Sequence, residues 1–129
     1  MVDVPFRTLL HDADGRNAQE GLWVVDEPDR WARYCDASWM SEPPPVPEVD
    51  FNAEVVLVLA SGGRGTGGFG VEILNLVDDG DTLVVYAVEQ RLGPDRGATQ
   101  AVTYPHHAVA IARRPEGPLR LVLEITWWW

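Results

Sequence analysis

The chain has 129 residues, of which 46% are hydrophobic and 23% charged, which fits one globular domain with a single core and excludes a largely disordered protein. Its net charge is −10 and all ten basic residues are Arg, so the surface would repel nucleic acid and anionic membranes, whose binding depends on Lys and Arg. One cysteine, Cys35, cannot form a disulfide within the chain, so the fold does not require an oxidising compartment.

Residues 26–40 are predicted to form the one helix. Asp26 is a candidate N-cap and Pro28 suits the first turn, while Trp31, Cys35 and Trp39 recur on one helical face. This face should pack on a sheet. The proline-rich residues 42–47 are then predicted to form an extended connector.

Strands dominate the rest of the chain. Residues 51–60 form an apolar run of the kind found in a strand buried on both faces, and residues 69–77 alternate as a strand. Asp78-Asp79-Gly80-Asp81 indicates a hairpin turn with a return strand over residues 82–89. Further strands are expected through Val102, over residues 108–112, and over residues 119–125, where the alternation predicts a half-buried strand.

These elements predict a mainly β fold with one α-helix packed on the sheet, either an antiparallel β-sandwich or an open barrel. We expect a single domain over residues 1–129. The chain as given shows no signal peptide and no apolar stretch of membrane-spanning length, so a cytoplasmic location is the default expectation.

The most unusual segment is a glycine-rich stretch that directly follows the strand over residues 51–60. It contains two matches to Gly-x-Gly-x-x-Gly, but a dinucleotide site needs a helix next, where this chain alternates as a strand, and a Walker loop needs a Lys. Two readings stay open, a tight bulged turn between antiparallel strands and a loop presented to a protein partner. On the second reading the partner-binding residues are Gly62, Gly63, Arg64, Gly65, Thr66, Gly67, Gly68 and Phe69.

No cofactor, bound metal or catalytic constellation is expected. His106 and His107 are adjacent, so on a strand they point to opposite faces and cannot both ligate one ion; one should be packed and the other solvated. Cys35 should be buried on the helix face and therefore inert. The terminal Trp run cannot all point inward, which indicates a surface contact among Trp127, Trp128 and Trp129.

Several short motifs in order carry a family resemblance. They are Val49-Asp50-Phe51 before a strand, Thr66-Gly67-Gly68-Phe69 at the end of the glycine stretch, Thr99-Gln100, and Thr103-Tyr104-Pro105-His106. Over about residues 31–113 the chain resembles the PrcB-type domain, the C-terminal domain of a protease complex subunit family. The resemblance implies a non-catalytic β domain that accompanies other proteins, often on secreted or envelope-anchored bacterial chains. The chain departs from the pattern in having Phe69 where Tyr is usual and in lacking a lipobox cysteine.

Three functions follow as hypotheses. The first is a protein-interaction or accessory domain, with a protease as a candidate partner. The second is a protease inhibitor that inserts the glycine-rich loop, which is similar in type to the loop of chagasin-like inhibitors. The third is a carbohydrate-binding module, which requires exposed Trp side chains in a coplanar strip.

Overall fold

The computed structural model describes residues 1–12, 20–37, 45–62, 70–92 and 104–128. One helix and eight strands occur in these residues, in the order β1 (Val2–Asp3), β2 (Phe6–Asp12), β3 (Glu20–Val25), α1 (Pro28–Ala37), β4 (Glu54–Ser61), β5 (Gly70–Asp78), β6 (Leu83–Leu92), β7 (His106–Ala112) and β8 (Leu119–Trp128). The predicted strand through Val102 lies outside the described residues. Strands β1, β2 and β3 were not predicted.

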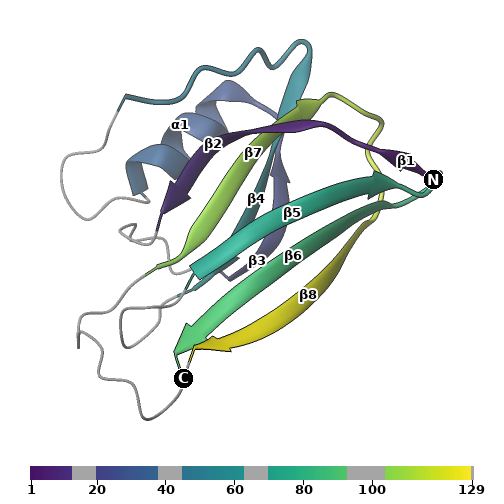
Figure 1. Cartoon of the computed structure of the whole chain (residues 1–129). Helices are drawn as coiled ribbons and strands as arrows, with labels where there is room; N and C mark the ends of the chain where they lie inside the picture. The colour runs from purple at the N-terminus through teal and green to yellow at the C-terminus, as the bar shows by residue number, and fades with distance from the viewer. Residues whose placement is uncertain (13–19, 38–44, 63–69, 93–103, 129) are drawn as a thin grey trace.

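The strands form two four-stranded sheets that face each other (Figure 1). Sheet A has the order β1-β5-β6-β8 and sheet B the order β2-β7-β4-β3. All neighbouring strands are antiparallel except β6 and β8, which run parallel. The predicted mainly β fold is confirmed, and of the two predicted architectures the sandwich is the one observed.

The core lies between the sheets and continues under the helix. Strand β4 contributes to both parts, because Leu57 and Leu59 face sheet A while Val56 and Val58 face α1. The predicted burial of this strand on both faces is confirmed, since its residues 55–60 are all buried. Successive strand side chains alternate between faces, so only a strand covered on both sides can be apolar throughout.

Helix α1 packs on the outer face of sheet B, as predicted from its apolar face (Figure 1). Trp31 and Cys35 are buried there, whereas Trp39 lies outside the described residues. The predicted cap at Asp26 is wrong. Glu27 is the N-cap, because its carbonyl accepts the first helical hydrogen bond from the Trp31 N–H at 3.1 Å. Asp26 instead pairs with Arg30 at 3.2 Å, and Pro28 occupies the first helical position as expected.

The predicted hairpin between β5 and β6 is confirmed. Gly80 has φ +93°, and its N–H donates to the Asp78 carboxylate at 2.8 Å. The turn closes with the Asp79 N–H donating to the Thr82 carbonyl at 3.0 Å. A side-chain carboxylate that accepts from the backbone two residues on, followed by glycine in the left-handed region, is typical of such turns.

The glycine-rich segment, predicted to join two antiparallel strands, runs from β4 of sheet B to β5 of sheet A and so connects the two sheets. One prediction about strand environment is wrong. The segment over residues 119–125 was expected to be half-buried, but Leu121, Leu123 and Ile125 are 37%, 39% and 42% exposed. They face the interior side of sheet A at its edge, beyond the part that sheet B covers.

In the part of the chain that is described, no helix is long and apolar enough to cross a membrane.

Candidate functional site

The strand register brings seven strand ends together at one end of the sandwich, here called the loop end, including the end of β2, where Asp12 pairs with His106. On sheet B, Glu20 pairs with Ser61 and Ala60 pairs with His106. On sheet A, Gly70 pairs with Gln90, which also pairs with Thr126 of β8. Both flanks of the glycine-rich segment therefore start at this end.

Of the predicted partner-binding loop, Gly62 is described and residues 63–69 lie outside the described residues. Gly62 is buried and has φ +73°, in the left-handed region that favours glycine. The residue before it is fixed, because the Ser61 N–H donates to the Pro105 carbonyl at 3.0 Å. The chain therefore leaves β4 through a constrained position.

Substitution of Gly62 by valine is expected to lower the free energy of unfolding by about 1–2 kcal/mol or more, because a β-branched side chain is strained at positive φ. Urea denaturation of both proteins measures the difference. Gly70→Ala at the start of β5 is the matched control. Gly70 lacks a positive φ and a Cβ there would meet no atom within 4 Å, so its change should stay within about 0.5 kcal/mol. Equal effects of the two substitutions would contradict a conformational constraint at Gly62.

The histidine pair differs from the prediction in one respect. His106 and His107 do point to opposite faces of β7, but both are 2% exposed. His106 lies under α1, with its ring 6.2 Å from that of Tyr34, and His107 points between the sheets. Neither is solvated because sheet B is covered on both faces, by the helix and by sheet A.

His107 has a defined hydrogen-bonding environment. The Ile73 N–H donates to Nδ1 at 2.8 Å, so the proton of the neutral ring is on Nε2, which lies 2.9 Å from the Thr8 hydroxyl oxygen. The His11 ring stacks on it at 4.2 Å, and His11 Nε2 donates to the Val71 carbonyl at 2.8 Å. Burial, and then the proximity of His11 and His106, lowers the pKa of His107 to about 4.

A second polar group lies near the carboxyl end of β6. Glu89 faces the interior and is 3% exposed, with its carboxylate 3.0 Å from the Arg91 guanidinium. That guanidinium in turn lies 5.8 Å from the Trp127 ring centroid. Trp127 is 49% exposed, so one residue of the predicted contact run is at the surface. The side chain of Trp128 and all of Trp129 lie outside the described residues.

Burial raises the pKa of the Cys35 thiol to about 12, so little thiolate forms at neutral pH. Among the described residues, no three His, Cys, Asp or Glu side chains are grouped so that they could hold a metal ion.

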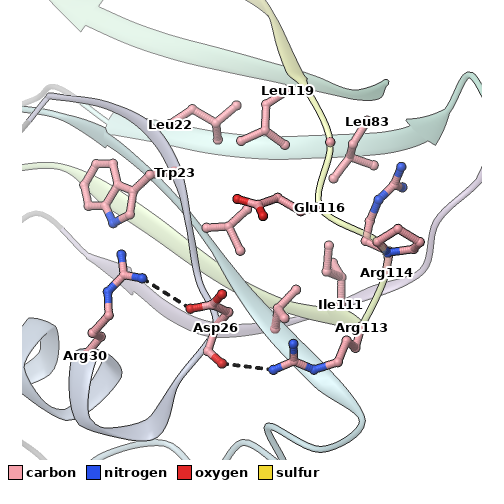
Figure 2. A pocket seen from close by; sticks show the side chains of 14 residues that line it. Leu22, Trp23, Asp26, Arg30, Leu83, Ile111, Arg113, Arg114, Glu116 and Leu119 are labelled. Atoms are coloured by element: carbon pink, nitrogen blue, oxygen red, sulfur yellow. Dashed lines mark hydrogen bonds and ion pairs between the residues drawn. The ribbon is translucent and has the colours of Figure 1, made fainter. Parts of the chain in front are cut away.

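A cleft of about 570 Å³ is present in the described part of the chain (Figure 2). It lies between β3 and residues 113–119, towards the end of the sandwich opposite the loop end. Leu22, Val55, Leu83, Ile111 and Leu119 provide its apolar surface, and Asp26, Arg30, Arg113, Arg114 and Glu116 provide its charged groups.

Hydrogen bonds fix the charged side of this cleft. The Arg113 guanidinium donates to the carbonyls of Asp26 and Phe51, both at 2.9 Å, which ties the end of β7 to the residues that precede α1 and β4 (Figure 2). Arg114 lies 3.2 Å from the Asp78 carboxylate. Both signs of charge are therefore present around an apolar floor.

Sequence reasoning did not find this cleft. Its walls come from four places that are distant in the chain, namely residues 22–30, Val55, Leu83 and residues 111–119. One signal was available, the pair Arg113-Arg114 directly after an apolar strand in a chain with only ten basic residues.

Comparison with known proteins gives one family. The model described as PrcB C-terminal matches residues 55–112, which run from β4 to the end of β7 and include the glycine-rich segment and both buried histidines. No curated protein and no solved structure matches the chain. The match indicates an accessory domain of a protease-associated protein, and this is not a known catalytic family. Residues 55–112 of the chain therefore match the PrcB C-terminal family.

Proposed function

We propose that the chain is a non-catalytic accessory domain that binds a protein partner, and that an apolar side chain of the partner enters the cleft between β3 and residues 113–119. The cleft is the single observation that carries the proposal. Its volume, about 570 Å³, is within the usual range of binding pockets.

The residues that line the cleft favour a polypeptide as its ligand. Protein interfaces combine an apolar centre with a polar rim. Here Leu22, Leu83 and Leu119 line the centre, while the Asp26–Arg30 ion pair and Glu116 supply groups of both signs at the side. Such a rim can bind the polar groups that flank an apolar residue in an extended peptide.

The segment over residues 62–69 is a second contact surface in this proposal. It lies within the family match and follows β4, a strand with both faces buried, so it is attached to a rigid part of the domain. The positive φ of the buried Gly62 supports the view that the backbone must leave β4 in one particular direction where this segment begins. The cleft and Gly62, with which this segment begins, lie towards opposite ends of the sandwich, so variants can separate the two surfaces.

A carbohydrate-binding function has less support. Of the described Trp side chains, Trp31 is buried and Trp23 is half-buried, while Trp127 is exposed. One exposed indole does not make the coplanar strip that stacking on sugar rings requires.

Panning the chain against a random peptide library displayed on phage tests the cleft. Selected peptides should contain a recurrent large apolar residue, and Leu22→Arg should weaken their binding about tenfold or more because it puts a charge into the apolar floor. Arg30→Glu should weaken binding several-fold, by about 1 kcal/mol. Arg33→Glu is the matched control, since Arg33 is exposed on the same helix and outside the cleft.

Equal binding to Leu22→Arg, Arg30→Glu and Arg33→Glu would exclude the cleft. If the same peptides lost affinity for folded Gly62→Val instead, the contact surface would be at the loop end. Circular dichroism of each variant checks that the sandwich is retained.

A further inference from the structure

The edge of sheet A formed by β8 offers a second interaction surface, independent of the cleft. Strand β8 is the last in the order β1-β5-β6-β8 and pairs with β6 along its whole length (Figure 1). No other strand of the described residues pairs with its outer edge. Unpaired edges of this length readily accept another strand.

The backbone groups at that edge can be assigned. The Leu83 N–H donates to the Pro118 carbonyl at 3.1 Å, while Leu83 is the register partner of Leu119. In a parallel ladder a residue bonds to the neighbours of its register partner. The even-numbered residues of β8 therefore bond to β6, and the odd-numbered ones direct their N–H and C=O groups outward.

The side chains on the interior side of this edge are apolar and uncovered. Leu121 and Leu123 are 37% and 39% exposed, whereas their register partners on β6, Val85 and Ala87, are 0% and 3% exposed. The apolar row continues through Ile125 and Trp127. A strand added beside β8 would cover part of this surface.

We propose that a second copy of this chain supplies that strand, with two β8 strands pairing antiparallel about a two-fold axis at Val122. Arg120 and Glu124 lie two residues on either side of Val122 and on the same outer face of the sheet, where their register partners are Val84 and Val88. The axis at Val122 places Arg120 opposite Glu124 of the second copy, and the symmetry makes this ion pair twice.

The backbone agrees with this register. The odd-numbered residues, whose polar groups face outward, fall opposite one another, so Leu121 pairs with Leu123 of the second copy and Leu119 with Ile125. Each such pair can exchange two N–H···O bonds. Arg120 and Glu124 then occupy the positions without backbone hydrogen bonds, where opposite side chains approach most closely.

Neighbouring symmetric registers are worse. An axis at Arg120 or at Glu124 places like charges opposite each other, and an axis at Leu121 or Leu123 leaves the charged residues without a charged partner. Like charges directly opposite destabilise a strand pair. The charge pattern of β8 therefore favours one register over its alternatives.

Sedimentation equilibrium on the full chain tests the proposal. The wild-type protein should dimerise, and Arg120→Glu and Glu124→Arg should each raise the dissociation constant about tenfold or more, because each variant places like charges opposite each other. An equimolar mixture of the two variants should dimerise again, since each carboxylate at these positions in one variant then faces a guanidinium of the other across the axis. Arg33→Glu on α1 makes the same change in net charge as Arg120→Glu and should leave the dimer unchanged.

A monomeric wild-type protein would overturn the proposal. So would a wild-type protein whose β8 pairs only with an extended segment of another protein and not with a second copy of the chain. A dimer that tolerates both charge reversals would also overturn it, because another surface would then be responsible. Failure of the mixture to restore association, with both variants folded by circular dichroism, would contradict the register.

Discussion

Replacement of Trp31 by alanine is expected to lower the free energy of unfolding by about 3–5 kcal/mol, the usual cost of truncating a buried aromatic side chain. The Trp31 side chain is 2% exposed and its ring stacks on that of Tyr34 at 5.7 Å. Its indole N–H also donates to the Pro47 carbonyl at 3.0 Å. One residue therefore joins the helix, the outer face of sheet B and the connector that leads to β4.

Trp31→Phe separates these contributions. Phenylalanine keeps an aromatic ring beside Tyr34 and loses the hydrogen bond to Pro47, so it should cost less, about 1–2 kcal/mol. Urea denaturation followed by far-UV circular dichroism measures both variants. A loss below about 1 kcal/mol for Trp31→Ala would show that α1 contributes little to the stability of the sandwich.

The predictions that held depend on local chemistry. The spacing of Trp31 and Cys35 identified the buried face of α1, and the Asp-Gly signal identified the β5–β6 turn, because both are decided within a few residues. Strand β4 was recognised because burial on both faces requires a continuous apolar run. Strands β1, β2 and β3 lack such a signal, since their exposed and half-buried residues do not separate into a clear alternation.

Strand pairing is decided by contacts between distant segments, and there the sequence was less informative. The apolar alternation in β8 is real, but it cannot show that β8 lies parallel to β6 at an edge, where the apolar face stays exposed. For the same reason the alternation rule separated His106 from His107 correctly but not their environments, because the cover on each face comes from α1 and from sheet A.

The residues of the candidate site also fall into those that the sequence alone can indicate and those that only the folded structure brings together. Gly62 and Trp127 could be selected from their composition and position, because glycine runs and terminal tryptophans are unusual in themselves. The cleft between β3 and residues 113–119 could not, because its floor consists of ordinary core residues such as Leu22 and Leu83, which only the packing of the two sheets brings to one opening.

Acidification is expected to destabilise the domain through His107 over a defined range of pH. Its pKa is lowered from the ordinary 6.5 to about 4 in the folded chain. Above about pH 6.5 neither the folded nor the unfolded state protonates it, so it contributes no pH dependence. Between that value and about pH 4 the unfolded state binds a proton that the folded state does not, and stability falls as the pH is lowered. The loss should reach about 2 kcal/mol at pH 5 and about 3 kcal/mol below pH 4.

Comparison of the wild-type protein with His107→Gln isolates this effect from that of the 20 acidic residues. A glutamine amide can accept from the Ile73 N–H and donate to Thr8, as the neutral imidazole does, but it does not titrate. Protonation of the imidazole would place a proton on Nδ1, against the Ile73 N–H, and a positive charge beside the stacked His11 ring. His107→Gln should therefore gain about 2 kcal/mol relative to wild type between pH 7 and pH 5 in urea denaturation. An NMR titration that gives His107 a pKa near 6.5, or a stability difference that does not change with pH, would show that its buried contacts do not hold the ring neutral.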